Sequence, residues 1–440
     1  MRRNLINETP NLIGQTARLA GWVNVRRDHG KLIFIDLRDR SGMIQMVIIP
    51  DKEEAYKIAK DIRSEYAIEA EGLVKKRPGG AANENILTGG VEIEVEKIKI
   101  LSAPAEELPV DISEDDLNLH LETLLDNRVI TLRNKKVKAI FTVYSEILKA
   151  YADFMKIEGF TEIKTPKILS AATEGGANFF KIKYFEREAF LAQSPQFYKQ
   201  AGAGIFERVF EIGTVFRAEP HFTTRHVNEY IGLDAEMAFI ENFSDVMNEL
   251  EMAMAYIIKE IQKNCAAELH MYKAELLPVK NIPRIRLTEA LEILEKEYGK
   301  KMETVDIDSE GERLICEWAK KAHNSDFVFL THYPASIRPF YSMPSAEDSQ
   351  FTETFDLLFR GVEIASGGQR IHDYNQLVEN IKKHRLNPDD YEHYLDIFKY
   401  GMPPHGGWGL GSERIVQKML GLKSIKEALL FPRDVKRLTP

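Results

Sequence analysis

The sequence predicts an α+β protein made of a small N-terminal β-barrel and a larger domain whose largely antiparallel sheet is flanked by helices. Short apolar runs separated by Gly, Asp and Asn fill residues 1–105, which indicates an all-β domain. From Lys136 onward the pattern turns helical and then continues as strands and helices without regular βαβ alternation. That succession favours an α+β domain over a doubly wound one.

The first domain, residues 1–105, is predicted to be a closed five-stranded barrel of the OB type. Its strand-like runs are RLAGWVNVRR, KLIFIDLRDRSG, MIQMVII, IEAEGLVKK and VEIEVEKIKIL. The charged segment KEEAYKIAKDIRS follows the third run and has the apolar spacing of a helix. Five strands with one helix after the third favour an OB barrel, a fold that binds oligonucleotides.

Residues 106–135 are acidic and lack a clear core pattern, so we interpret them as a connector. The larger domain is expected over residues 136–440. It begins with a helix, because apolar residues recur three and four apart up to Met155. Gly159 suits the C-terminal cap of this helix, and FTEIKTP is interpreted as a strand that Pro166 ends.

The remaining segments are assigned more coarsely. Strands are expected in AFLAQSP, VFEIGTVFR, GLDAEMAF, VFLTHYPASIRPFY and TFDLLFRGVEIASGG, and helices at 243–263 and 288–297. GWGLGSERIVQKMLG is expected to be a glycine-rich strand end that runs into a helix. Residues 264–330 are predicted only as mixed helix and strand.

Composition limits the class of protein. A chain that is 44% hydrophobic and 29% charged, with a net charge of −9, is typical of a globular protein rather than a generally basic nucleic-acid binder. No apolar run approaches the ~18 residues of a transmembrane helix, and no secretory signal is expected. Cys265 and Cys316 lack metal-ligand spacing, which predicts free thiols in a cytoplasmic protein. There is neither a Walker loop nor a Rossmann fingerprint.

Residues 209–239, VFEIGTVFRAEPHFTTRHVNEYIGLDAEMAF, place charged side chains on the two strands and the tip of one predicted hairpin. Arg217 and Arg225 can clamp phosphate oxygens in a bidentate manner. Glu219 can accept a hydrogen bond from an adenine amino group, and Tyr230 offers a flat face for a base. The alternative interpretation is a solvated hairpin with surface charges.

The segment GLGSER adds a second set of candidate phosphate ligands. Gly409 and Gly411 allow the backbone to approach a ligand closely. Arg414 opens the following helix, where it can meet phosphate or stack on a base. The alternative is a glycine-kinked strand followed by a helix with a solvated arginine.

The segment FDLLFRGVEIASGGQRIHD carries Asp356 and Glu363 on what we predict to be one apolar strand. A buried acid needs a partner or a cation. Mg²⁺ takes few carboxylates and shares phosphate oxygens, so these acids are candidate magnesium ligands. Ser366 and Arg370 follow across a Gly-Gly kink, and Arg370 is a fork suited to a carboxylate. The alternative is a bulged strand with an internal salt bridge.

The segment FLAQSPQFYKQ places Gln196 and Lys199 around an expected exposed turn. Together, Lys199 and Arg370 would form a doubly positive pocket suited to a small dianionic side chain. Asp234 would then meet the α-ammonium group of the same ligand. The alternative is a polar loop with one lysine.

These segments resemble the three motifs of the class II aminoacyl-tRNA synthetases, in the right order and over essentially the whole chain. Motif 1 matches the helix and strand that end at Pro166, motif 2 matches FRAE-loop-RHVNEY, and motif 3 matches GLGSER. The N-terminal OB barrel resembles subclass IIb. SPQFYKQ, FDLLFRGVEIASGGQR and LLFPRD are similar to the aspartyl-tRNA synthetases. The catalytic part looks like the archaeal and eukaryotic kind, and the barrel like the bacterial kind.

The resemblance implies that the chain attaches L-aspartate to tRNA(Asp) through aspartyl-adenylate, with ATP as substrate and Mg²⁺ as cofactor. The residues that it implies for ATP are Arg217, Glu219, Arg225, His226, Tyr230, Glu363, Gly411 and Arg414, with Arg217, Glu219 and Arg414 catalytic. The residues that it implies for aspartate are Glu174, Gln196, Lys199, Asp234, Ser366 and Arg370. The residues that it implies for Mg²⁺ are Asp356, Glu363 and Ser366.

In the barrel, the resemblance implies an anticodon site. Phe34 matches the aromatic residue that stacks on an anticodon base, Gln45 matches a base reader, and Arg26 and Arg27 would contact phosphate. Single-strand readers do combine aromatic faces with basic grooves. The alternative for Phe34 is a core residue of the barrel.

His29 and Gly80 resemble family members that charge both tRNA(Asp) and tRNA(Asn), which would imply a tRNA-dependent amidotransferase partner. Motif 1 implies a homodimer. The competing functions are an asparaginyl-tRNA synthetase, for which Lys199 would not be expected, and a regulatory RNA-binding protein with an inactive synthetase domain.

Overall fold

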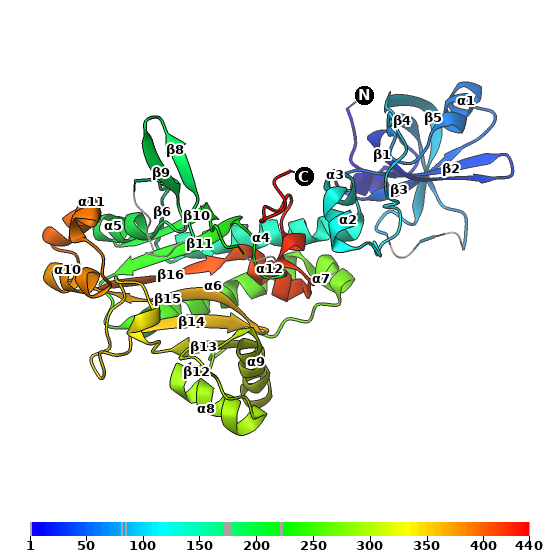
Figure 1. The fold of residues 1–440 in the computed structure, drawn as a ribbon. Helices are drawn as coiled ribbons and strands as arrows, with labels where there is room; N and C mark the ends of the chain where they lie inside the picture. Colours follow the sequence, from blue (N-terminus) through cyan, green and yellow to red (C-terminus); the bar gives the residue numbers. More distant parts are fainter. Residues whose placement is uncertain (1, 81, 84–85, 171–177, 221–222, 440) are drawn as a thin grey trace. The chain divides into compact units, whose positions relative to one another are not determined.

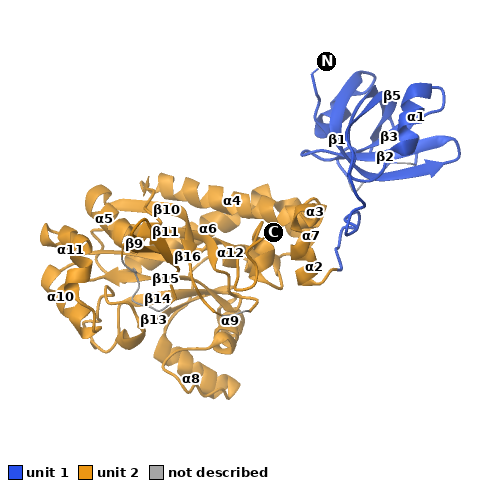
Figure 2. Cartoon of the chain, turned by 45° about the horizontal axis from the view of Figure 1, so that its top comes forward, with its two compact units in different colours: residues 1–118 blue, residues 119–440 orange. Residues whose placement is uncertain are grey.

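The structure is a computed structural model that describes residues 2–80, 82–83, 86–170, 178–220 and 223–439. The chain divides into two compact units, Met1–Asn118 and Leu119–Pro440 (Figure 2). Within the described ranges, no helix is both long enough and apolar enough to cross a membrane.

The first unit contains a closed barrel with the strand order β1-β2-β3-β5-β4, which confirms the predicted OB-type fold (Figure 1). Its elements are η1 Ile6–Leu12, β1 Thr16–His29, β2 Leu32–Arg38, β3 Met43–Ile48, α1 Glu53–Asp61, β4 Ala67–Lys76 and β5 Val91–Ser102. In β2, Ile33, Ile35 and Leu37 point into the core while the residues between them are half-buried. This alternation is the period-2 signal that predicted the strand.

The second unit is built on an eight-stranded sheet with the order β12-β13-β14-β15-β16-β11-β10-β6 (Figure 1). The pairs β10/β6 and β12/β13 are parallel, and the other pairs are antiparallel. Its strands are β6 Thr161–Glu162, β10 Arg208–Phe216, β11 Glu229–Ala238, β12 Arg284–Arg286, β13 Phe327–Thr331, β14 Thr354–Phe359, β15 Val362–Arg370 and β16 His405–Gly411. A smaller sheet is formed by β7 Ile168–Leu169, β9 Arg187–Leu191 and β8 Lys181–Tyr184.

Helices flank this sheet, as predicted for the α+β class. They are α2 Leu121–Asp126, α3 Arg128–Thr131, α4 Lys135–Ile157, α5 Gln196–Phe206, α6 Phe243–Asn264, α7 Ala266–Tyr272, α8 Leu287–Tyr298, α9 Ser309–His323, α10 Tyr374–Lys383, α11 Glu392–Lys399 and α12 Ser412–Leu420. Shorter 3-10 turns are η2 Ala335–Ile337, η3 Pro388–Tyr391 and η4 Ile425–Ala428. The apolar faces of α4 and α6 share one core with β11, β14 and β16.

The ends of helix α4 agree with the signals that predicted it from sequence. The side chain of Asn134 accepts hydrogen bonds from the amides of Lys136 and Val137 and so caps the N-terminus of the helix. After Ile157 the chain turns through Gly159, whose φ of 78° is the left-handed conformation that glycine adopts readily.

Three predicted strands differ in the structure. The segment TFDLLFRGVEIASGG is a hairpin rather than one strand, because Arg360 and Gly361 both have positive φ, at 47° and 84°, and form the turn between β14 and β15. VFLTHYPASIRPFY is a strand only to Thr331 and continues into η2. FTEIKTP contributes only the two residues of β6.

Candidate active site

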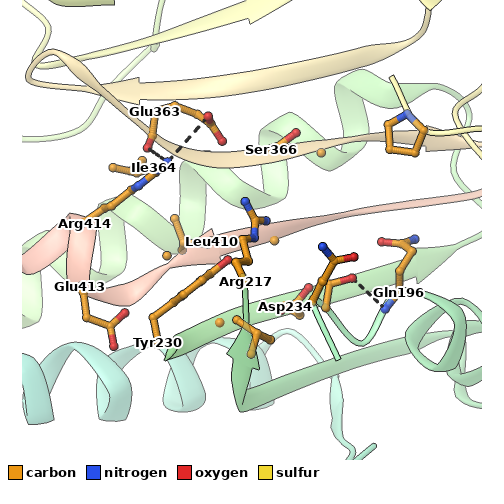
Figure 3. Close-up of a pocket in the computed structure, with 18 of the residues that line it drawn as sticks. Gln196, Arg217, Tyr230, Asp234, Glu363, Ile364, Ser366, Leu410, Glu413 and Arg414 are labelled. Carbon is orange, nitrogen blue, oxygen red and sulfur yellow. Dashed lines mark hydrogen bonds and ion pairs between the residues drawn. The ribbon is translucent and has the colours of Figure 1, made fainter. Parts of the chain in front are cut away.

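A cavity of about 300 Å³ lies over the centre of the large sheet (Figure 3). It is lined by residues of β10, β11, β15 and β16 and by the start of α5. The predicted residues that line it are Gln196, Lys199, Arg217, Glu219, Arg225, His226, Tyr230, Asp234, Glu363, Ser366, Arg370, Gly411 and Arg414. Asp356 does not line the cavity, and Glu174 falls outside the described residues. Residues that are far apart in sequence therefore share one space.

One end of the cavity holds a buried lysine. Lys199 Nζ donates to Asp234 Oδ1 at 2.9 Å and to the carbonyl oxygen of Trp408 at 2.8 Å. Burial raises the pKa of Asp234, and the charge of Lys199 offsets part of that effect. The expectation that SPQFYKQ forms an exposed turn is wrong, because this segment is the first turn of α5, where Gln196 and Lys199 are 4% and 2% exposed.

A buried arginine lies at the same end. Arg370 Nε donates to Glu236 Oε1 at 3.0 Å, and its Nη2 donates to the carbonyl oxygen of Gly407 at 2.9 Å. Sequence reasoning did not select Glu236 as a site residue. Its position two residues after Asp234 was the available signal, because alternate residues of a strand share one face. The doubly positive pocket therefore contains two cations that are each already paired with a carboxylate.

A hydrogen-bonded row extends from Gln196 away from the cavity. Gln196 Nε2 donates to Gln200 Oε1 at 3.0 Å, and the hydroxyl of Tyr394 donates to the same oxygen at 3.0 Å. Gln200 Nε2 lies 2.8 Å from His405 Nε2. Burial lowers the pKa of His405 to about 4. The imidazole is therefore neutral at pH 7, and the row holds Gln196 in a fixed orientation.

The other end of the cavity is more open. The side chain of Arg217 is 40% exposed, lies 5.7 Å from the ring centre of Tyr230, and is 3.8 Å from Glu219. His226 Nε2 is 3.5 Å from a second oxygen of Glu219. Arg225 is engaged elsewhere, since its Nη2 donates to the carbonyl oxygen of Gly361 at 2.5 Å. The ion pairs of Glu219 with Arg217 and with His226 are 3.8 and 3.5 Å long, and long, partly solvated ion pairs contribute little stability.

Arg414 lies opposite this group. Its Nη1 donates to the carbonyl oxygen of Glu363 at 2.7 Å and is 3.7 Å from the Glu363 carboxylate. Figure 3 shows Glu363 and Arg414 together at one side of the cavity, and Asp234 and Gln196 at the other. The site thus has an end with buried ion pairs and an end where the side chains of Arg217 and Arg414 are 40% and 27% exposed.

The candidate magnesium ligands lie on the two strands of the β14–β15 hairpin. Burial, and then repulsion from Asp356, raise the pKa of Glu363, so a cation near both carboxylates would relieve an existing penalty. Arg338 supplies part of the positive charge near these carboxylates, because it donates to Asp356 at 2.7 Å and to Ser366 Oγ at 3.0 Å. Within the described ranges, no cluster of three or more His, Cys, Asp or Glu has the arrangement of a metal site. Two carboxylates and a hydroxyl fit Mg²⁺, which keeps several of its waters.

Arg338 and Glu413 are further cavity residues that sequence reasoning missed. Arg338 falls in a segment interpreted as a strand, and its partner Asp356 is 18 residues away. Glu413 accepts hydrogen bonds at 3.0 Å each from the amide of Ile231 and the hydroxyl of Tyr144. Burial raises the pKa of Glu413 to about 7. Its position beside Arg414 was the only signal for Glu413.

The glycines of β16 form the floor between the two ends. A Cβ on Gly407 would lie 2.3 Å from Glu236 Oε2, so no side chain fits there. A Cβ on Gly409 would come no closer than 3.3 Å to any neighbour, and one on Gly411 no closer than 3.8 Å. At these two positions the space over the backbone is the cavity itself.

The residues predicted for the anticodon lie in the barrel. Strand register places Arg27 opposite Phe34, and Asp36 opposite Gln45, so these side chains share the outer face of β1, β2 and β3. Phe34 is half-buried there rather than in the core.

The other five residues predicted for the anticodon are placed as follows. Arg27 pairs with Asp36 at 2.9 Å, and Gln45 donates to Glu92 at 3.0 Å. Arg26 points to α1, where its Nε donates to the carbonyl oxygen of Ala59 at 3.0 Å. His29 is the exposed last residue of β1, and Gly80 lies in an exposed turn. The structure thus brings Arg27, Phe34 and Gln45 together and leaves Arg26 aside.

Comparison with known proteins agrees with this geometry. The family described as tRNA synthetases class II (D, K and N) matches residues 120–435, and the OB-fold nucleic acid binding domain matches residues 17–101. The chain is 45% identical to the aspartate–tRNA(Asp/Asn) ligase of Aeropyrum pernix over 99% of its length and 98% of the relative. It is 44% identical to the aspartate–tRNA(Asp) ligase of Pyrococcus horikoshii over 100% of both chains.

Among solved structures, the asparaginyl-tRNA synthetase of Pyrococcus horikoshii, complexed with asparaginyl-adenylate, superposes with a TM-score of 0.92 at 33% identity. The alignment covers 100% of both chains. The similarity therefore extends over both units.

Proposed function

The chain belongs to the class II tRNA synthetases of the D, K and N group, and from that premise we propose that it attaches L-aspartate to tRNA. The observation that carries the proposal is the sharing of one cavity by Lys199 and Arg370 with Arg217 and Arg414. The first two suit a short acidic side chain, and the last two suit phosphates. ATP is the second substrate, as in the family.

In the first step, an oxygen of the aspartate α-carboxylate attacks the α-phosphorus of ATP. The bond from that phosphorus to the bridging oxygen breaks, and pyrophosphate leaves with the bonding electrons. Arg217 stabilises the charge that develops on the phosphoryl oxygens, and Arg414 holds the phosphates at the other side. Catalysis of this kind depends on positioning and electrostatic stabilisation rather than on a side-chain nucleophile.

The remaining residues position the substrates. Lys199 and Arg370 hold the β-carboxylate of aspartate, and Gln196 and Asp234 hold its amino group. Glu219 and Tyr230 hold adenine, while Arg225 and His226 serve the phosphates. Glu363, Asp356 and Ser366 would hold Mg²⁺, which neutralises phosphate charge when bound.

In the second step, a hydroxyl of the terminal adenosine of tRNA attacks the carbonyl carbon of aspartyl-adenylate. The ester bond to tRNA forms as AMP leaves. Phe34, Gln45, Arg26 and Arg27 in the barrel bind the anticodon. We assign His29 and Gly80 to the acceptance of a tRNA(Asn) anticodon, and the name of the Aeropyrum pernix relative, which includes both tRNAs, supports this assignment.

Asparagine is the alternative amino acid, because the chain is also similar to an asparaginyl-tRNA synthetase. A neutral amide leaves a buried ammonium without a counter-charge from the substrate, so Lys199 favours aspartate. Pyrophosphate exchange measured with aspartate and with asparagine separates the two. Exchange that depends on asparagine alone would replace the proposal, and no exchange with either would favour an inactive domain that only binds RNA.

Charging of purified tRNA(Asp) and tRNA(Asn) with aspartate tests the choice of tRNA. We expect both to be charged, and failure with tRNA(Asn) would restrict the enzyme to tRNA(Asp). If both are charged, a tRNA-dependent amidotransferase is needed to convert the aspartyl group on tRNA(Asn). The proposal includes a cytoplasmic homodimer that contacts through α4 and Pro166, the motif 1 elements.

A further inference from the structure

The segment after α12, residues 424–437, lies against the loop that joins β10 to β11. The amide of Ile425 donates to the carbonyl oxygen of Thr224 at 2.9 Å, and the amide of Asn228 donates to the carbonyl oxygen of Arg433 at 2.8 Å. We call residues 424–437 the C-terminal segment. Its two backbone bonds flank Arg225 and His226 in sequence, and the side chain of Ile425 lines the cavity.

The C-terminal segment is stiffened internally. Lys426 Nζ and Asp434 Oδ2 form an ion pair of 2.6 Å with side chains 2% and 4% exposed. Ser424 caps η4, with its hydroxyl accepting from the amide of Lys426 at 3.3 Å. A segment closed by a buried ion pair moves as one piece, because opening it would leave both charges unpaired in the interior.

Two arginines hold the far side of the C-terminal segment against α2 and α3. Arg128, at the start of α3, is 1% exposed and donates to three main-chain carbonyls: Leu430 at 2.9 Å, Glu427 at 3.0 Å and Leu429 at 2.6 Å. From the C-terminal segment itself, Arg437 pairs in return with the carboxylates of Glu122 at 3.0 Å and Asp126 at 2.6 Å on α2.

Burial lowers the pKa of Arg128 to about 10, which reflects the cost of placing this charge in the interior. A methionine could fill the same space without that cost. The guanidinium instead donates to three main-chain carbonyls, which a methionine could not do.

From these contacts we infer that Arg128 is a positioning residue for the ATP site. It holds the C-terminal segment, which in turn holds the described parts of the β10–β11 loop at Thr224 and Asn228. The inference rests on the proposed function in that the loop carries ATP ligands. Helices α2 and α3 directly follow the first unit in sequence. The same contacts therefore link the start of the second unit to the nucleotide end of the cavity.

The test compares Arg128→Met with Arg208→Met in aspartate-dependent ATP–pyrophosphate exchange. Arg208 is the comparison variant: it lies over Phe160 as Arg128 lies over Phe141, and it donates to the carbonyl oxygen of Glu158, but at the end of β10 away from the β10–β11 loop. Because Arg208 is also ion-paired with the buried Glu249, its loss should lower stability without changing the KM for ATP. For Arg128→Met we expect the KM for ATP to rise about tenfold while the KM for aspartate stays within about twofold. Arg128→Lys should recover part of the loss.

Hydrogen exchange gives a readout that does not depend on activity. Peptides covering 223–230 and 424–434 should lose protection in Arg128→Met and keep it in Arg208→Met. If Arg128→Met does not fold, the same measurements are made on Arg437→Met. This variant removes only the ion pairs from the C-terminal segment to Glu122 and Asp126 on α2. Unchanged ATP KM and unchanged protection, or equal effects in the control, would overturn the inference. Absence of exchange activity in the unsubstituted protein would overturn the proposed function instead, while the protection data would still stand.

Discussion

The two ends of the active-site cavity are built on different principles. At the amino-acid end, Lys199 and Arg370 are almost fully buried and already bonded to Asp234 and Glu236. At the nucleotide end, Arg217 is 40% exposed and lies 3.8 Å from the carboxylate of Glu219. A buried pair keeps its geometry without ligand, whereas an exposed arginine gains a fixed geometry only when an anion binds. The first end is therefore suited to selecting the amino acid. The second end is suited to stabilising the negative charge that develops on the phosphoryl oxygens during the reaction.

The strongest test of this contrast is Lys199→Met. The substitution removes the cation that is bonded to the buried Asp234, while Glu236 keeps its partner Arg370. We expect a loss of about 3–5 kcal/mol in the free energy of unfolding and a fall in exchange activity, mainly through a raised KM for aspartate. Urea unfolding and exchange kinetics measure the two effects. The double substitution Lys199→Met, Asp234→Asn is the control, and it should recover part of the stability but none of the aspartate binding.

Arg217→Met should give the opposite combination. Exchange should fall by about 10²–10³ in kcat, while the free energy of unfolding changes by less than about 0.5 kcal/mol, because the side chain lies partly in solvent and its ion pair with Glu219 is 3.8 Å long. The same two assays apply. A stability loss as large as that of Lys199→Met would contradict the division of the cavity into two kinds of end.

Glu413→Gln examines a buried acid at the nucleotide end. Burial raises the pKa of Glu413 from 4.5 to about 7, so the folded state binds more protons than the unfolded state between these values. This group therefore contributes stability that is fully present below pH 4.5 and is lost as pH rises to about 7. We expect the stability difference between Glu413→Gln and the unsubstituted protein to change by about 2–3 kcal/mol across this window. Denaturant unfolding at several pH values measures it, and a constant difference would show that Glu413 titrates normally.

The smallest effect is expected outside the cavity. Phe34→Leu should raise the KM for tRNA by about tenfold, as expected for the loss of one stacked base, and should leave tRNA-independent exchange unchanged. Charging kinetics and exchange on the same preparation measure both. A changed exchange rate would mean that Phe34 supports the fold of the barrel rather than tRNA binding.

Much of the fold and most of the cavity were readable from sequence because each signal was local. The barrel strands alternate over single runs, and the helix at Lys135–Ile157 carries its cap and its periodicity within one segment. The motif residues cluster in short stretches. Glu236 could also have been found, since it shares a strand face with Asp234.

What sequence could not provide was the pairing between distant segments. Nothing near Arg338 indicates that it bonds to Asp356 across 18 residues. SPQFYKQ is polar in sequence, yet it is buried, because its polar groups find partners on β11, β16 and α11. The turn at Arg360 and Gly361 was missed because a bulky residue with positive φ is uncommon.

The backbone floor of the cavity restricts how this site can diverge. Between the two ends the surface beneath a ligand is main chain, and at Gly407 any larger residue would strike Glu236. At Gly409 and Gly411 a side chain would enter the cavity itself and obstruct a ligand, since a Cβ there would come no closer than 3.3 Å to a protein atom. New substrate preferences in chains of this architecture must therefore arise on the surrounding walls, through α5, β11 and the β14–β15 hairpin, while the floor stays the same.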